Sequence, residues 1–151
     1  MPRAENGQKT PAGSLEQEVY LDLVRTAARV EHAVGEALKP YGLTRTQYNV
    51  LRILRGARPI GLCRSEVQAR MLTPVPDATR LLDRLAEAGL VVRDRDTDDR
   101  RFVTTRITEA GLELLGTLDR PIVEMHERQF GHMSHADLRR LSDLLREARA
   151  G

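Results

Sequence analysis

The sequence predicts a mainly α-helical fold with one small β-hairpin. Apolar residues recur every three or four positions over most of the chain, which is the pattern of helices that bury one face. Residues 90–95 and 102–107 are instead rich in Val, Thr, Phe and Ile, which favour strands. Because the chain has 151 residues, the usual size of one domain, we expect a single hydrophobic core.

The composition excludes several classes of protein. No segment approaches the roughly 18 uninterrupted apolar residues of a membrane-spanning helix, so we expect no membrane partner. A lone cysteine, Cys63, excludes an intrachain disulfide framework and a multi-cysteine zinc site. Residues 1–13 have neither apolar periodicity nor the apolar run of a secretory signal, so we expect a disordered lead-in and a cytoplasmic protein.

The positive charge is concentrated in the middle of the chain. The net charge is only +2, but residues 45–106 contain 13 Arg, no Lys and 8 acidic residues, a local charge of +5. The planar guanidinium group suits phosphate oxygens and guanine edges. An arginine-rich genome would produce the same count, so the charge alone does not name the partner.

A long first helix is expected within residues 14–40. Ser14 and Gln17 have the spacing of a capping box, and Pro40 ends the helix. The apolar stripe of this helix consists of Leu15, Val19, Leu23, Ala27, Val30, Val34 and Leu38.

Three shorter helices are expected next. A capping box, Thr44 to Gln47, opens the first, which ends near Gly56. A short helix follows at about 64–71. The third should carry Pro76 in its first turn, where the missing N–H has no intrahelical acceptor, and should end before a glycine at position 89. Its apolar face consists of Ala78, Leu81, Leu82 and Leu85.

The end of the chain predicts a hairpin and two more helices. Six polar or charged residues separate the two strand-like segments, which indicates a hairpin with a charged tip. One helix begins at Thr108, with Pro121 expected to kink or divide it, and Ser134 caps the last. The helices at both ends of the chain thus carry apolar faces, and one small domain would not readily bury both of them. We therefore expect the helices of 14–40 and 108–149 to pair with a second copy, the alternative being an intrachain bundle.

Residues 41–107 predict a winged helix-turn-helix. Two short helices are joined by a tight proline-containing turn and followed at once by the charged hairpin. The second helix of such a motif can enter a DNA major groove, so double-stranded DNA is the expected partner. A homodimer would then require a pseudo-palindromic operator with half-sites about one helical turn apart.

Arginines on the outer face of that second helix are the first candidates for DNA contact. We expect Arg80 to read a base, guanine through a bidentate pair, and Arg84 to hold a phosphate. Asp83 and Glu87 would be repelled by phosphates, so the helix should enter by its amino-terminal end. The alternative is a solvated face on which the arginines pair with neighbouring acids.

The hairpin tip is the second candidate. An arginine on an extended loop can reach into a narrow minor groove, as Arg100 and Arg101 could. Three carboxylates of the tip, at Asp96, Asp98 and Asp99, suggest a cation site, but the Gly and distal Glu of a calcium loop are absent, so we expect no metal. The full set of candidate DNA-contacting residues is Arg64, Pro76, Asp77, Thr79, Arg80, Arg84, Arg95, Asp99, Arg100 and Arg101.

With these motifs the sequence resembles the MarR (multiple antibiotic resistance regulator) family. The resemblance spans about residues 15–148 and implies a homodimeric transcriptional regulator, usually a repressor, that a small ligand or an oxidant releases from DNA. The motifs that carry it are Leu43-Thr44-x-x-Gln47-Tyr48-x-Val50-Leu51, Ser65-Glu66-Val67, Thr79-Arg80-Leu81-Leu82-Asp83-Arg84-Leu85 with Gly89-Leu90-Val91, Asp96-x-x-Asp99-x-Arg101, and Ile107-Thr108-x-x-Gly111.

Two kinds of sensor site follow as candidates. The resemblance implies a ligand pocket between the DNA-reading lobe and the dimer helices, which brings in Val24, Tyr48, Met71 and His126, although each of these is also an ordinary core residue type. Cys63, at a helix amino terminus beside an arginine, is a candidate oxidant sensor. The alternative for Cys63 is a small buried side chain without reactivity.

Enzyme motifs are missing. The chain has no Gly-rich phosphate loop, no Gly-x-Ser-x-Gly turn and no His-Glu-x-x-His helix, so we expect neither catalysis nor a cofactor. The alternative to a DNA-binding regulator is a winged-helix module that binds a protein partner without specific DNA binding.

Overall fold

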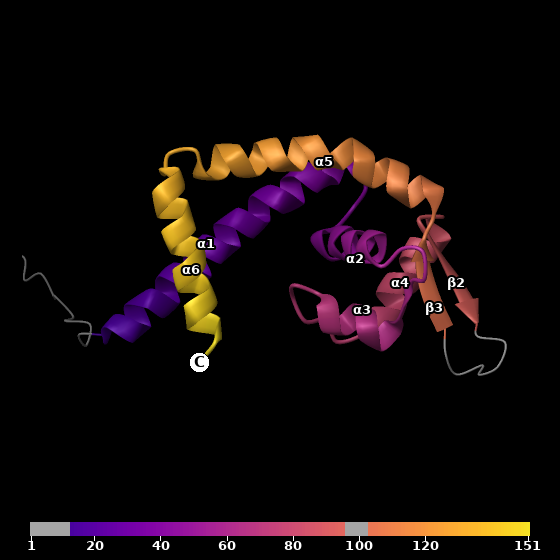
Figure 1. The fold of residues 1–151 in the computed structure, drawn as a ribbon, viewed down its shortest axis with the longest axis horizontal. Coiled ribbons are helices and arrows are strands. Elements are labelled where there is room, and N and C mark those ends of the chain that lie inside the picture. The colour runs from indigo at the N-terminus through magenta and orange to yellow at the C-terminus, as the bar shows by residue number, and fades with distance from the viewer. Residues whose placement is uncertain (1–12, 96–102) are drawn as a thin grey trace, which may run out of the picture. The chain divides into compact units, whose positions relative to one another are not determined.

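The structure, a computed structural model, describes residues 13–95 and 103–151 (Figure 1). These residues divide into two units, up to Ala33 and from Val34 onward. The first unit contains most of helix α1 (Leu15–Leu38), and every residue from Gly13 to Arg29 is exposed. The second unit contains the other helices and the sheet. No helix in the described part of the chain is both long and apolar enough to span a membrane.

The first helix has the expected bounds. The backbone N–H of Gln17 donates to Ser14 Oγ at 3.2 Å and so caps the first turn of α1. The helix ends at Leu38 and a short 3₁₀ turn, Lys39–Tyr41, carries Pro40. Gly42 then takes a positive φ of 70°, a conformation that glycine adopts without strain.

Three helices pack together in the second unit. They are α2 (Arg45–Gly56), α3 (Arg64–Arg70) and α4 (Ala78–Glu87). The expected capping box of α2 is present, since Thr44 Oγ1 accepts from Gln47 N at 3.2 Å and Gln47 Oε1 accepts from Thr44 N at 3.0 Å. The fully buried side chains of these helices form the core around which the site is built: Val50, Leu51, Leu54, Val67, Leu82 and Leu85.

Pro76 lies outside the helix whose first turn it was expected to occupy. Asp77 is the N-cap of α4, and Asp77 Oδ1 accepts from Thr79 N at 2.9 Å. Aspartate is among the strongest N-cap residues, so the helix begins two residues after Pro76. At the other end Gly89 has a φ of 74° and terminates α4 as expected.

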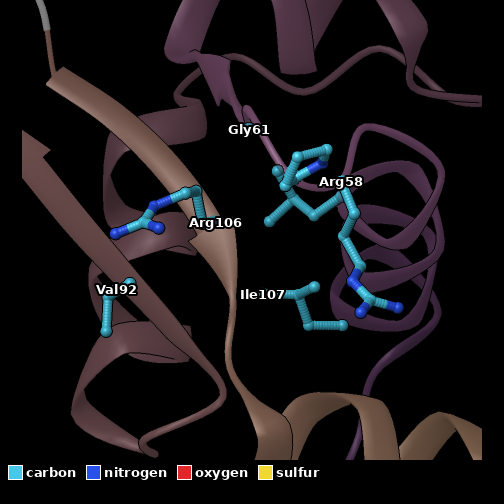
Figure 2. A pocket seen from close by; sticks show the side chains of 7 residues that line it. Arg58, Gly61, Val92, Arg106 and Ile107 are labelled. Atoms are coloured by element: carbon cyan, nitrogen blue, oxygen red, sulfur yellow. The ribbon is translucent and has the colours of Figure 1, made fainter.

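The wing is a three-stranded sheet. Strands β2 (Val91–Arg95) and β3 (Val103–Ile107) pair antiparallel, as the sequence predicts. A further strand, β1 (Leu62–Cys63), pairs with the other edge of β3 and was not expected, because two residues are too short to show alternation. Gly61 leads into β1 beside β3 (Figure 2), where a Cβ atom would lie 2.4 Å from the carbonyl oxygen of Thr105.

Two helices complete the second unit, α5 (Glu109–Phe130) and α6 (His135–Arg149). Helix α5 runs without a break through Pro121, so of the two expected effects of this proline, a kink or a division, the division is wrong and the kink stays a prediction. Leu118 and Ile122 are buried on either side of it, and their packing holds the helix where one backbone bond is lost. Ser134 caps α6 as predicted, accepting from Asp137 N at 3.1 Å. No residue of α6 is fully buried.

Candidate nucleic-acid interface

Helix α4 is held with one face in the core and the other in solvent. It packs against α2, α3 and β2 through Ala78, Leu82 and Leu85, which are at most 1% exposed. Its outer face carries four charged residues that are all exposed: Arg80, Asp83, Arg84 and Glu87. The apolar period of the sequence therefore predicts correctly which side of this helix faces outward.

Arg80 and Arg84 are available for DNA. Neither side chain has a hydrogen bond or ion pair with any residue that the structure describes. The alternative in which they pair with acids on their own helix is thus not seen. Two guanidinium groups one helical turn apart can meet a base edge and a phosphate without first breaking a contact to any residue in the described ranges.

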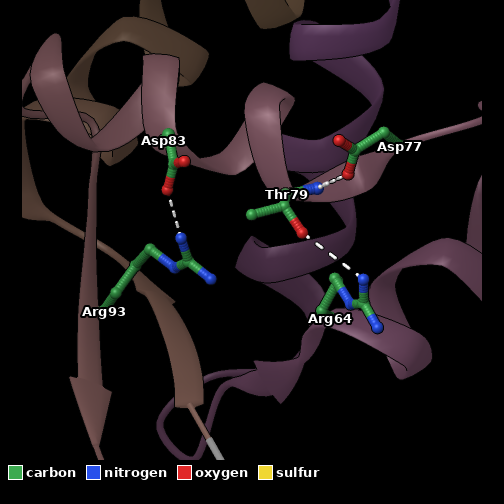
Figure 3. A network of polar contacts seen from close by, with 5 residues as sticks. All are labelled: Arg64, Asp77, Thr79, Asp83 and Arg93. Carbon is green, nitrogen blue, oxygen red and sulfur yellow. Dashed lines mark hydrogen bonds and ion pairs between the residues drawn. The ribbon is translucent and has the colours of Figure 1, made fainter.

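Arg64 and Thr79 are brought together at the amino-terminal end of α4 (Figure 3). Arg64 is the first residue of α3, and its Nη1 lies 3.4 Å from Thr79 Oγ1. Two of the sequence candidates from different helices therefore share one surface. Pro76 and Asp77, both exposed, lie just before them in the chain.

Two amide side chains that the sequence patterns did not single out hold the turn between α3 and α4. Gln68 Nε2 donates to the carbonyl oxygen of Val75 at 3.0 Å. Asn49 Oδ1, on α2, accepts from Leu72 N at 2.9 Å. These bonds satisfy backbone groups in a segment that contains two prolines and no regular structure, so the amino-terminal end of α4 has a defined position. Nothing in the spacing of Asn49 and Gln68 signals this role.

An ion pair joins the outer face of α4 to the wing. Arg93 Nη1, in the middle of β2, donates to Asp83 Oδ1 (Figure 3). Asp83 was expected to be repelled by phosphates or, in the alternative, to pair with an arginine of its own helix, but it pairs with an arginine ten residues further along the chain. Within the wing, Arg106 Nε donates to Asp94 Oδ2 at 2.9 Å.

The wing candidates are only partly within the described residues. Arg95 is exposed at the end of β2, on the side where the hairpin tip follows. Asp99, Arg100 and Arg101 lie outside the described residues, so their contacts with DNA stay predictions.

The ligand-pocket candidates lie on four different helices or helix ends. Val24 is 49% exposed on α1, in the first unit. Tyr48 is buried on α2, with Arg52 Cζ 5.8 Å from its ring centroid, and Met71 is the half-buried C-cap residue of α3. His126, half-buried on α5, has Nδ1 3.0 Å from Gln129 Oε1.

Cys63 is the half-buried N-cap residue of α3. Its backbone N–H donates to Glu66 Oε2 at 3.2 Å, and its Sγ lies 3.2 Å from Ser65 Oγ. Its role as an oxidant sensor stays a prediction. Among residues 13–95 and 103–151 no group of three or more His, Cys, Asp or Glu is placed to hold a metal ion.

A small pocket lies between the end of α2 and the wing (Figure 2). Its volume is about 200 Å³, less than the roughly 300 Å³ at which ligand pockets begin. The guanidinium groups of Arg58 and Arg106 point away from each other in Figure 2, so they do not converge on an anion. None of the four ligand-pocket candidates is among its lining residues, which are Leu54, Arg58, Pro59, Gly61, Val92, Arg106 and Ile107.

The N-cap bond gives Asp77 a structural role that can be measured. We expect Asp77→Ala to lower the free energy of unfolding by about 1 kcal/mol, because α4 loses the acceptor for Thr79 N. Asp77→Ser, which keeps an acceptor, is the matched control and should retain most of the stability. Denaturant titration at a fixed protomer concentration makes the comparison. Unchanged stability of Asp77→Ala would contradict the capping role.

Helices α3 and α4, their short turn and the adjoining β2–β3 wing define a winged helix-turn-helix. A sequence model of the MarR family matches residues 41–101. The uncharacterized HTH-type transcriptional regulator YkoM of Bacillus subtilis (strain 168) is 30% identical over 139 residues, which are 88% of this chain and 88% of YkoM. The chain belongs to the MarR family and is a DNA-binding transcriptional regulator, not an enzyme.

Solved structures agree with this assignment. The chain is similar to a MarR transcription factor from Planctomyces limnophilus, with 40% identity and a TM-score of 0.71, over 90% of this chain and 98% of the other. It is also similar to CouR from Rhodococcus jostii RHA1, whose crystal structure contains p-coumaroyl-CoA. That match has 30% identity and a TM-score of 0.74, over 91% of this chain and 95% of CouR.

Proposed function

We propose that the protein is a cytoplasmic homodimeric repressor that binds a pseudo-palindromic operator. The observation that carries the proposal is the pair of exposed arginines on α4, Arg80 and Arg84, which have no partner among the described residues and lie beside a wing rich in arginine. A second copy is required because one winged-helix lobe reads only one half-site.

Exposed apolar side chains support the dimer. On α1, Leu15 is 70% exposed, Val19 47% and Leu23 40%, although their spacing of four residues places them on one helix face. The apolar residues of α6 are at most half-buried. Monomeric proteins rarely expose such stripes, and pairing across a twofold axis buries them.

The binding mode follows from the positions of the arginines. Helix α4 enters the major groove by its amino-terminal end, where Arg80 meets a base edge and Arg84 a phosphate. The wing, with Arg95 at the end of β2 next to the tip and with Arg100 and Arg101 in the segment that follows, approaches the flanking minor groove.

Release from the operator is proposed to follow binding of a small ligand or oxidation of Cys63. The acyl-CoA ligand in the CouR structure supports a small-molecule effector for this chain. The pocket in Figure 2 does not favour such a role, because it is small and lacks convergent polar groups. Val24, Tyr48, Met71 and His126 remain the proposed ligand site.

Salt dependence tests DNA binding against the alternative of a protein-binding module. The probe is the duplex that the full chain selects from a randomised pool, with a scrambled duplex of the same composition as control. For 6–10 phosphate contacts, affinity should fall by about 10³–10⁵-fold between roughly 50 and 200 mM salt. Mobility shifts measure the slope. Failure to select any duplex at the lower salt concentration would contradict the proposed function and favour the protein-binding module.

A further inference from the structure

We propose that Asp83 and Arg93 are a positioning pair that fixes α4 against strand β2, so that the recognition helix and the wing approach DNA as one rigid unit. The inference rests on the proposed function, in which these two elements occupy neighbouring grooves. Neither residue is assigned a contact with a base or a phosphate.

The pair lies at the exposed edge of the contact between helix and wing. Helix α4 and strand β2 are in contact, and Leu85 on the helix and Val91 on the strand are at most 2% exposed. On the solvent side the Asp83–Arg93 ion pair joins the two elements (Figure 3). Contacts on both sides oppose rotation of the helix about its buried face more than contacts on the core side alone.

Arg93 is anchored on the sheet before it meets the helix. Its side chain is 22% exposed, whereas that of Asp83 is 52% exposed. Arg93 faces Thr105 in the β2–β3 register, and directly opposed residues place their side chains on the same face of a sheet. Arg93 Nε and the Oγ1 of fully buried Thr105 are buried and unpaired among the described residues. Because most of its side chain is buried, Arg93 loses less conformational entropy on pairing than the partners of an ordinary surface ion pair lose.

The other ion pairs of the described residues do not join the helix to the wing. Arg106–Asp94 links two strands that backbone hydrogen bonds already join. Lys39–Glu36, Arg120–Glu124 and Arg146–Asp143 each join residues only three or four positions apart in the chain. Arg55–Asp119 links α2 to α5, at 2.9 Å. Among the described residues, Asp83–Arg93 is therefore the ion pair placed to control the spacing of the two DNA-contacting elements.

The charge of Asp83 and its proposed positioning role predict opposite effects of Asp83→Asn on DNA binding. The substitution removes a negative charge from the helix face that carries Arg80 and Arg84, so electrostatics alone predicts tighter DNA binding. Loss of positioning predicts weaker binding to the operator. Glu87→Gln is the matched control, because it removes the same charge from the same exposed face without breaking a contact that the structure describes.

The DNA test uses the duplex selected by the wild-type full chain and its scrambled counterpart. Asp83→Asn should bind the selected duplex on the order of tenfold more weakly than wild type, and the scrambled duplex no more weakly. Glu87→Gln should bind both duplexes at least as tightly as wild type. Asp83→Glu keeps the carboxylate and should recover most of the affinity for the selected duplex that Asp83→Asn loses. The double variant Asp83→Asn, Arg93→Gln should bind this duplex no more weakly than Arg93→Gln alone. Equal binding of the selected duplex by Asp83→Asn and Glu87→Gln overturns the proposal.

Amide hydrogen exchange tests the pair without DNA. In Asp83→Asn the amides of α4 should exchange faster than in wild type while those of α5 are unchanged, and Glu87→Gln should match wild type. Unchanged exchange in α4 overturns the proposal. An equal increase in all helices overturns it too, because the pair would then hold the whole fold. If wild type selects no duplex, the proposed function fails, whereas the exchange experiment still decides whether Asp83 and Arg93 hold the helix.

Discussion

Glutamate at both Val19 and Leu23 is expected to make the protein monomeric and to weaken operator binding by at least about 100-fold. Both residues are largely exposed on α1 within one chain, so the substitutions remove no contact of the core. At an interface between copies, however, four negative charges would be buried without partners, which no stable dimer tolerates. A monomer also loses the gain in affinity from binding two half-sites at once.

Arg25→Glu is the control for this double variant. Arg25 is exposed on the polar side of the same helix, so glutamate there should leave the dimer intact. Analytical ultracentrifugation measures the mass, and mobility shifts on the selected duplex measure the affinity. If the double variant sediments as a dimer, α1 does not form the interface that we propose.

The second large effect is expected from Arg80→Ala. Loss of a bidentate contact to a base should cost about 1–3 kcal/mol per half-site and relax the preference at one base position. Arg84→Ala, one turn further along the same exposed face, is the matched variant. It should weaken binding to all duplexes alike and reduce the salt slope by about 1 per contact, because a phosphate contact carries no sequence information.

Selection from a randomised pool with each variant distinguishes these two roles. The Arg80→Ala pool should lose one conserved position in each half-site, whereas the Arg84→Ala pool should keep the wild-type consensus. Identical consensus sequences for wild type and Arg80→Ala would show that Arg80 reads no base.

Local signals predicted most of the helix ends. Ser14, Thr44 and Ser134 each cap the helix that they were expected to begin, since the cap oxygen and the backbone N–H that donates to it lie three residues apart. For α4, Pro76 was the local signal from which the first turn was predicted, whereas the side-chain cap of Asp77 defines the helix start. Signals of this kind are readable because both partners lie in one turn of chain.

Features that depend on distant partners were not readable. Strand β1 forms only because β3, about forty residues later, offers an edge to pair with. Helix α5 continues through Pro121 because packing at Leu118 and Ile122 outweighs a local preference. Asp83 and Arg93 lie on a helix and on a strand, so no periodic pattern within one element links them, and the sequence showed two separate charges. The sequence predicted which face of α4 is exposed. It did not predict the Asp83–Arg93 pair or the side-chain bonds of Asn49 and Gln68 that hold this helix in position.

Methylation protection of guanine N7 on the selected duplex tests the central claim most directly. If a dimer inserts one α4 into each of two successive major grooves, wild type should protect two symmetric clusters of guanines about one helical turn apart. A single protected cluster, or none under low-salt conditions where the complex forms, would contradict the account.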